Sequence, residues 1–229
     1  MCSSDLSLVR MFGKFYSGKA AWGTGHTGFK GAWLRLWLRD LGAHVHGFAL
    51  EAHAPPNIHE TLAPNTIASE TSGDIGDFDL VKQAAVDARP DIVFHLAAQP
   101  LVGRSYVAPL ETATTNILGT AHVLEALREN KNDCPVVVVT SDKCYENDGA
   151  SRAFTEVDPP GGPGLYSASK SATGRGPRPC MLRGCSKWPW RGDNFCYKEI
   201  SFRRGRECHE EPGSRGCYRG RRHGGRRAL

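Results

Sequence analysis

Apolar residues along the first two thirds of the chain follow two kinds of spacing, which alternate. Runs that are continuously apolar, or that alternate with polar residues as strands do, occur at 43–50, 91–98 and 136–140. Apolar residues recur at helical spacing over 32–41, 77–85 and 116–127. Gly42 is the expected C-terminal cap of the first helix, and Asp77 the expected N-terminal cap of the second. Strands that alternate with helices predict an α/β fold on a doubly wound parallel sheet of the Rossmann type.

Two segments depart from this pattern. Residues 19–23, where the first strand of such a sheet belongs, contain no branched aliphatic residue, whereas buried parallel strands are normally rich in Val, Ile and Leu. This composition puts the first strand in doubt. Residues 52–72 contain Pro55, Pro56 and Pro64 and predict an irregular loop.

Charge and composition divide the chain after Lys170. Residues 1–171 hold 14 Lys+Arg and 19 Asp+Glu, a net charge of −5, whereas residues 172–229 hold 15 and 5, a net charge of +10. The second part contains no valine, and such a sequence cannot bury an apolar core. We therefore expect an N-terminal extension at 1–11, one domain at 12–173 and an irregular or disordered basic tail at 174–229.

A glycine-spaced loop at Thr24–Gly31 precedes the first predicted helix. Two registers compete in it, Gly23-x-Gly25-x-x-Gly28 and Gly25-x-x-Gly28-x-x-Gly31. We prefer the second, because it places Gly31 in the first helical turn, where the helix must pack tightly on the sheet. Bare glycines and the free N–H groups of a helix start are typical of a site for pyrophosphate. The alternative is a plain tight turn.

Other candidate groups lie at the carboxyl ends of the predicted strands, where parallel sheets bind ligands. Glu51 ends the second strand and can bind the ribose hydroxyls of a dinucleotide, which favours NAD over NADP. The alternative interpretation of Glu51 is a solvated loop acid. Tyr166 and Lys170 are i,i+4 neighbours on a predicted helix. Ser141 follows a predicted buried strand. A neighbouring ammonium favours the phenolate of tyrosine, and a hydroxyl can hold the same substrate oxygen.

Five stretches together resemble the extended short-chain dehydrogenase/reductases, which are NAD-binding enzymes. They are Thr24–Gly31, His95–Pro100, Asn116 in its helix, Thr140–Asn147 and Tyr166–Lys170. Within this superfamily, the phrases TGHTGFKG and TSDKCYEN look like those of the CDP-glucose 4,6-dehydratases. The resemblance covers about residues 12–171. It implies an NAD-dependent lyase that converts CDP-D-glucose into CDP-4-dehydro-6-deoxy-D-glucose, for bacterial surface polysaccharide.

The resemblance also implies catalytic roles. Tyr166 takes the proton of the sugar C4 hydroxyl, Lys170 lowers its pKa, and Ser141 holds the oxygen. Asp142 protonates the departing C6 hydroxyl. Lys143 serves in removing the C5 proton, at a position where dTDP-glucose dehydratases carry a glutamate.

Further positions follow from the same resemblance. Asn116 matches the structural member of the catalytic tetrad. The implied cofactor positions are Gly25, Gly28, Phe29, Gly31, Asp74, Ile75, Ala97 and Ala98, together with Glu51. The implied partners are NAD and a nucleotide-sugar substrate, and the intact family form implies a homodimer.

The resemblance ends near Ala172-Thr173. The sequence that follows is rich in Arg, Gly and Cys and reads as a frame-shifted continuation. Its Gly174, Gly176 and Pro177 interrupt the helix that carries Tyr166. We therefore expect the 229-residue chain to lack dehydratase activity.

Three other functions compete with this interpretation. One is another epimerase or dehydratase of the same superfamily, against which the Asp142-Lys143 pair argues. Another is an inactive cofactor-binding fragment. The third is nucleic-acid binding by the arginine-rich tail, which no fold motif supports.

Metal sites and membrane spans find little support in the sequence. Histidines 44, 46, 53 and 59 crowd together without metal-site spacing, and the cysteines of the tail lack a paired C-x-x-C motif, so no metal is expected. No stretch approaches the ~20 apolar residues of a membrane span, and the first residues lack the basic and apolar regions of a leader. The cysteines of the body imply no disulfide framework, and a cytoplasmic location is expected.

Overall fold

The computed structural model describes residues 12, 14–52, 57–62, 66–146, 154 and 158–174. All of them belong to one of the two units of the chain, Met1–Glu199. The predicted N-terminal extension, and the predicted basic tail beyond Gly174, lie outside the described residues.

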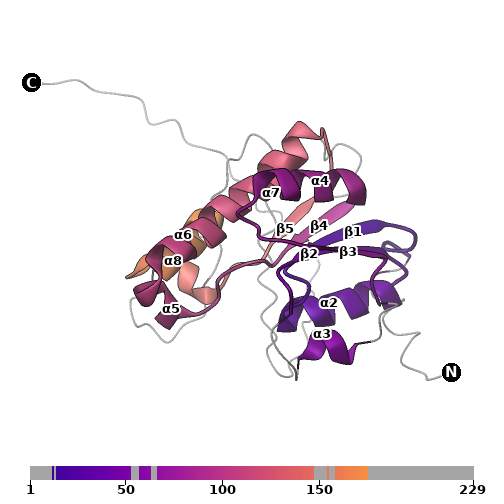
Figure 1. Ribbon diagram of the computed structural model, residues 1–229. Coiled ribbons are helices and arrows are strands. Elements are labelled where there is room, and N and C mark those ends of the chain that lie inside the picture. The colour runs from indigo at the N-terminus through magenta and orange to yellow at the C-terminus, as the bar shows by residue number, and fades with distance from the viewer. Residues whose placement is uncertain are drawn as a thin grey trace, which may run out of the picture. The chain divides into compact units, whose positions relative to one another are not determined.

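Five parallel strands form one sheet, in the order β3-β2-β1-β4-β5 (Figure 1). The strands are β1 (Ala20–Thr24), β2 (His44–Ala49), β3 (Ser69–Ser72), β4 (Ile92–His95) and β5 (Val136–Val138). The helices are α2 (Phe29–Asp40), α3 (Ile58–Thr61), α4 (Phe78–Ala88), α5 (Val102–Val107), α6 (Pro109–Ala113), α7 (Gly119–Glu129) and α8 (Leu165–Gly174). A π-helical turn, η2 (Thr114–Leu118), leads into α7, and a 3-10 turn, η3 (Asp142–Cys144), follows β5. This is the predicted doubly wound, Rossmann-type fold.

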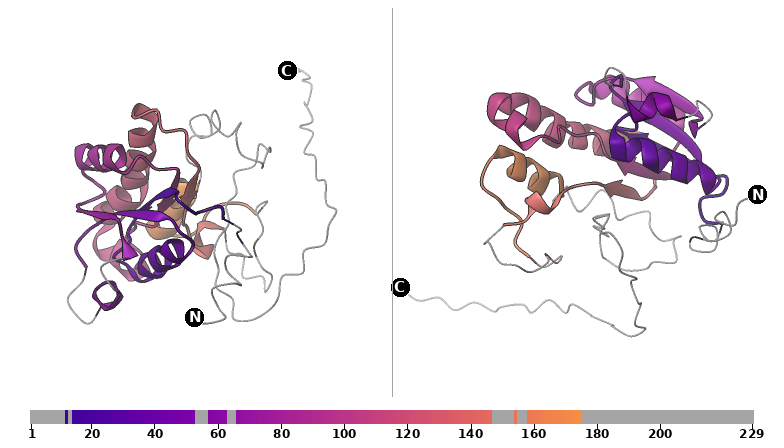
Figure 2. Two further views of the ribbon diagram at one scale, coloured as in Figure 1. Left: turned by 90° about the vertical axis from the view of Figure 1, so that its right-hand side faces the viewer. Right: turned by 90° about the horizontal axis from the view of Figure 1, so that it is seen from below.

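Helices cover both faces of the sheet (Figures 1 and 2). On one face, α4 and α7 pack on a core that includes Trp22, Phe48, Val81, Val93 and Val123. On the other face, α2 packs on a smaller core that includes Ala21, Leu38, Val45, Ile92 and Phe94. Because both faces of the sheet are buried, a ligand can bind only among the loops at the carboxyl ends of the strands.

The doubt about the first strand was wrong. Residues 20–24 form β1, which pairs with β2 on one side and with β4 on the other. Trp22 supplies the buried surface that a branched aliphatic residue would give, since it is 1% exposed and meets Phe48 edge to face. On the opposite face Ala21 is buried beside α2. Pairing on both edges therefore outweighs the low intrinsic strand propensity of the segment.

The predicted caps form as expected. Gly42 adopts a left-handed φ of 88°, and the N–H of Ala43 bonds the carbonyl of Leu38 across the end of α2. The Asp77 carboxylate accepts a hydrogen bond from the N–H of Leu80 at 3.1 Å, at the start of α4.

The prediction of an irregular loop over residues 52–72 was wrong in part. A short helix, α3, lies at Ile58–Thr61, and the edge strand β3 at Ser69–Ser72. The β3 sequence SETS is polar because only one edge of the strand is paired, with β2, and its side chains are largely exposed. Neither hydrophobic alternation nor an apolar run marks such a strand. The helices α5 and α6 were likewise not predicted.

Candidate active site

The loop between β1 and α2 owes its shape to two glycines. Gly25 has a φ of 73°, and a Cβ there would lie 2.7 Å from the backbone nitrogen of Ala97. A Cβ on Gly31 would lie 2.2 Å from the carbonyl oxygen of Gly25. Gly23, by contrast, is a residue of β1 itself. This geometry favours the register Gly25-x-x-Gly28-x-x-Gly31. The closest contacts of Gly31 are with the loop, however, and not with the sheet as expected.

Gly28 sits at the open start of α2. A Cβ on Gly28 would meet the Gly25 carbonyl oxygen at 3.4 Å, an ordinary contact, so the space in front of it is free of protein. The helix start has no side-chain cap and no acidic residue in its first turn, and Phe29 and Lys30 are exposed. Free N–H groups, the positive end of the helix dipole and the Lys30 ammonium can together bind an anion such as pyrophosphate.

Three of the expected cofactor-binding residues, Glu51, Asp74 and Ile75, lie just beyond the ends of β2 and β3. Glu51 is exposed two residues beyond β2, and the hydroxyl of Thr27 in the glycine loop bonds the neighbouring Leu50 carbonyl at 3.1 Å. Asp74 is also exposed, and its carboxylate accepts a hydrogen bond from the N–H of Gly76 at 2.8 Å. Ile75 is buried in the core. The two carboxylates are therefore accessible, while Ile75 presents only its backbone.

The exit of β4 is tied to the exit of β1. Ala97 and Ala98 are half-buried there, and the N–H of Ala97 donates to the hydroxyl of Thr24 at 3.2 Å. The Thr24 hydroxyl donates in turn to Nδ1 of His95, at 2.7 Å. These contacts fix the two strand ends on either side of the glycine loop.

His95 lies at the centre of a buried chain of hydrogen bonds. The Thr120 hydroxyl donates to the carbonyl of Asn116 at 2.6 Å, so it must accept from Nε2–H of His95, 2.9 Å away. The partners thus assign the His95 proton to Nε2 and leave Nδ1 as an acceptor. Burial, with a smaller contribution from Lys170, lowers the pKa of His95 to about 3. The imidazole is therefore neutral and links β1 to α7.

Asn116, in the π-helical turn η2, fastens α8 to the sheet. Its carboxamide oxygen accepts from the N–H of Gln99 at 2.8 Å, and its amide donates to the hydroxyl of Ser169 at 2.9 Å. The Ser169 hydroxyl bonds the carbonyl of Tyr166, and Thr173 bonds the Asn116 carbonyl. Asn116 therefore ties the helix that carries Tyr166 to the segment that follows β4.

The structure brings the predicted hydroxyl and phenol together. The Ser141 side chain follows β5 and lies near enough to the Tyr166 phenol to affect its pKa. Asp142 and Lys143 are exposed beside Ser141, in η3. Burial raises the pKa of Tyr166, the Ser141 hydroxyl opposes this effect, and the charge of Asp142 adds to it. The net direction is upward, so the lowered tyrosine pKa expected from the sequence is not found in this structure.

Lys170 lies one helical turn beyond Tyr166 and is also buried. Burial is the main reason that its pKa falls to about 8, and the charge of Lys30 adds to the effect, while Cys144 opposes it. Lys170 of α8 and Lys30 at the start of α2 are therefore close enough for their charges to interact.

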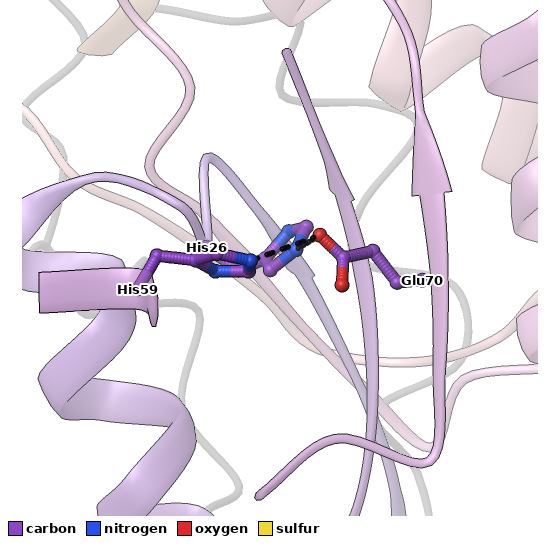
Figure 3. Close-up of side chains that lie close together, drawn as sticks. All are labelled: His26, His59 and Glu70. Atoms are coloured by element: carbon purple, nitrogen blue, oxygen red, sulfur yellow. Dashed lines mark hydrogen bonds and ion pairs between the residues drawn. The ribbon is translucent and has the colours of Figure 1, made fainter. Parts of the chain in front are cut away.

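A second cluster, which the sequence did not predict, joins His26, His59 and Glu70 (Figure 3). Their donor atoms lie within 4.8 Å of one another, as in a metal site. However, Arg35 Nη1 lies 2.8 Å from Nδ1 of His59 and can only donate, so the His59 proton is on Nε2, facing Glu70. Histidines that bind metals show the opposite arrangement, with a bare nitrogen toward the ion and the N–H toward an acceptor. The hydrogen bonds are those of a metal-free cluster.

No spacing rule could have found this cluster, because its members come from the glycine loop, α3 and β3. Of the other histidines considered, His44 and His46 lie on β2, and His46 bonds Ser69, while His53 lies outside the described residues. Within the described part of the chain, no helix is both long and apolar enough to cross a membrane.

Known proteins are similar to this chain in sequence and in fold. The chain is 46% identical over 156 residues to the CDP-glucose 4,6-dehydratase of Salmonella typhimurium, covering 68% of this chain and 44% of that protein. It is 33% identical over 159 residues to a dTDP-glucose 4,6-dehydratase of Xanthomonas campestris, covering 66% and 45%. The crystal structure of Thermus thermophilus UDP-glucose 4-epimerase complexed with NAD is 26% identical, with a TM-score of 0.59, and the match covers 68% of this chain and 48% of that one.

The chain spans less than half the length of these curated relatives. The model of the family described as GDP-mannose 4,6 dehydratase matches residues 24–175, from the end of β1 to just beyond α8. This match covers more than half of the chain, and the chain therefore belongs to the GDP-mannose 4,6 dehydratase family of nucleotide-sugar dehydratases.

Proposed function

We propose that this chain carries the cofactor-binding and catalytic half of a CDP-glucose 4,6-dehydratase. The reaction converts CDP-D-glucose into CDP-4-dehydro-6-deoxy-D-glucose and water. The observation that carries the proposal is that the Ser141 hydroxyl lies near enough to the Tyr166 phenol to affect its pKa, with Asp142 and Lys143 in the 3-10 turn that follows β5. The 46% identity to the Salmonella CDP-glucose dehydratase supports CDP-glucose over other nucleotide sugars.

The cofactor we propose is NAD. When bound, NAD supplies a hydride acceptor for the sugar C4 and returns the hydride to C6. The uncapped start of α2 and the open space at Gly28 suit its pyrophosphate. Glu51 would accept hydrogen bonds from the adenosine ribose hydroxyls. Its carboxylate would repel the additional phosphate of NADP. The remaining contacts proposed for the cofactor come from Gly25, Phe29, Gly31, Asp74, Ile75, Ala97 and Ala98.

Tyr166 would remove the proton of the C4 hydroxyl, and Ser141 would hold the same oxygen. Because burial raises the pKa of Tyr166, its phenolate needs positive charge close by. Lys170, on the next turn of α8, is the residue placed to supply it. Asn116 would keep this helix at the correct distance from the sheet through Ser169.

Water loss would fall to the two exposed residues of η3. Once C4 is a ketone, the proton on C5 becomes acidic. Lys143 would remove it, and Asp142 would protonate the departing C6 hydroxyl. An epimerase of the same superfamily needs no such pair, so Asp142 and Lys143 favour dehydration over epimerisation. An inactive cofactor-binding fragment stays the alternative that the following two experiments test.

Replacing Gly28 by valine is expected to abolish NAD binding while leaving the fold intact. The backbone of Gly28 has an ordinary φ of −73°, and a Cβ there meets no protein atom closer than 3.4 Å. The valine would instead fill the space that the pyrophosphate needs. Isothermal calorimetry measures the affinity, and thermal unfolding measures the fold. The matched control is Gly103→Val. A Cβ on Gly103 meets nothing within 4 Å, and Gly103 lies in α5, far along the chain from the glycine loop. Unchanged affinity in Gly28→Val would place the cofactor elsewhere.

Replacing Asp142 by asparagine is expected to stop water loss but not the first oxidation. The amide cannot donate an acid proton, whereas Tyr166 and Ser141 are untouched. The assay joins residues 1–171 to the C-terminal region of the Salmonella relative and supplies CDP-glucose with NAD. We expect reduced-nicotinamide absorbance without 4-keto-6-deoxy sugar in the variant, and product in the parent and in the control Asp133→Asn.

The unaltered 229-residue chain is expected to give no product in the same assay.

Normal turnover by Asp142→Asn would show that Asp142 is not the acid that protonates the departing hydroxyl. A parent that oxidises no CDP-glucose would contradict the proposed substrate.

A further inference from the structure

His26 lies in the middle of the glycine loop, yet its ring is buried and bonded to β3. We propose that His26 is a positioning residue, whose hydrogen bond to Glu70 holds the glycine loop in the shape that binds the cofactor pyrophosphate. The inference rests on the proposed NAD-binding function. It adds to the site a pair of residues that touch neither the cofactor nor the substrate.

The sheet is built to receive the His26 ring. A Cβ on Gly47 of β2 would lie 2.7 Å from the ring nitrogen Nδ1, so the strand is bare where the ring packs. The ring is 2% exposed, and Nε2 lies 2.8 Å from Oε1 of Glu70 (Figure 3). The loop residue between Gly25 and Gly28 is thereby fixed to a strand two places across the sheet.

Only one polar group of protein holds this ring within the described part of the chain. Burial is the main cause that lowers the pKa of His26, and Arg35 and His59 act in the same direction, although Glu70 opposes them. The neutral ring carries its proton on Nε2, where Glu70 accepts it. Nδ1 is buried without a hydrogen-bond partner among the described residues. Removal of the Glu70 carboxylate would therefore leave the ring with no polar anchor.

The same carboxylate also reaches the helix that would bind the anion. Nε2 of His59 lies 3.5 Å from Glu70 Oε1, and Arg35 of α2 holds His59 through Nδ1 and the backbone carbonyl, both at 2.8 Å. Arg35 is itself buried. Glu70 thus joins the glycine loop, α3 and α2 on one face of the sheet, and a disturbance there is transmitted to the N–H groups at the start of α2.

Glu70 offers a clean test because it is on the edge strand and partly exposed, so its replacement leaves no buried cavity. In the 229-residue chain, Glu70→Ala is expected to weaken NAD binding roughly tenfold, the size of effect typical of losing a hydrogen bond to a charged group. Glu70→Gln keeps an oxygen that accepts from Nε2–H and is expected to stay within about threefold of the parent affinity. The control is Glu60→Ala, which removes an equally charged, exposed carboxylate from neighbouring α3.

Amide hydrogen exchange separates positioning from general stability. In Glu70→Ala we expect faster exchange at Phe29, Lys30 and the loop before them, with unchanged protection of β4. Equal NAD affinity in Glu70→Ala and the parent, or equal loss in Glu70→Gln and Glu70→Ala, would overturn the inference. So would stoichiometric zinc binding that Glu70→Gln removes, because the cluster would then be a metal site. A parent that binds no NAD would refute the proposed function, and the exchange pattern would still decide whether Glu70 holds the loop.

Discussion

Gly31→Ala is expected to abolish NAD binding and to lower the free energy of unfolding by roughly 3 kcal/mol, near the upper end of what overpacking costs. The new Cβ would lie 2.2 Å from the carbonyl oxygen of Gly25 and 2.6 Å from Cα of His26. Both are backbone atoms, so no side chain can turn aside to make room. The loop must open, and its opening separates Gly25 and His26 from the positions that shape the anion site.

Helix propensity alone predicts the opposite result for this variant. Gly31 lies in the first turn of α2, and alanine in a helix is more favourable than glycine by about 1 kcal/mol. Urea denaturation measures the change in unfolding free energy. A decrease would show that the close contact of the new Cβ outweighs the better helix propensity of alanine, and an increase would show the reverse. Gly103→Ala in α5 is the matched control, because a Cβ there meets nothing within 4 Å. A Gly31→Ala chain that unfolds at the same or a higher urea concentration would refute the tight packing of the loop.

Sequence patterns predicted the buried parts of the sheet well and its exceptions poorly. The strands β4 and β5 are apolar enough to be identified in isolation. The strand β1 is not, because its stability comes from two flanking strands and from one tryptophan that packs on Phe48. The edge strand β3 gives no signal, since its polar side chains need no burial. Local sequence cannot carry information about partners that are distant along the chain.

The candidate site divides in the same way. The glycine loop and the Tyr166–Lys170 pair have fixed spacing along the chain, so their positions could be predicted. The direction of the shift in the Tyr166 pKa could not be predicted, because burial decides it and burial is a property of the folded chain. The same holds for the cluster of His26 with Glu70, and for the partners of His95. These contacts join residues 25 to 71 positions apart.

His95 is expected to make the stability of the fold fall as the solution is acidified. Its pKa is about 3 in the folded chain, against 6.5 for an unperturbed histidine, because burial disfavours the charged ring. The unfolded chain therefore binds a proton at His95 as the pH falls below 6.5, while the folded chain does not. This contribution is complete above pH 6.5 and is lost on acidification at about 1.4 kcal/mol per pH unit, until the folded chain is protonated as well.

The comparison of the parent with His95→Asn isolates this contribution from the other titrating groups, which both chains share. At pH 7.5 the variant is expected to be the less stable, since an amide cannot span from Thr24 to Thr120 as the imidazole does. The difference in unfolding free energy should then narrow by about 1.4 kcal/mol per unit between pH 6 and pH 4, because the asparagine takes up no proton. Replacement of the exposed His44 by asparagine, measured in parallel, is the control. A constant difference for His95→Asn would mean that the folded chain accepts the proton, and that the buried chain from Thr24 to Asn116 is not fixed in the neutral form.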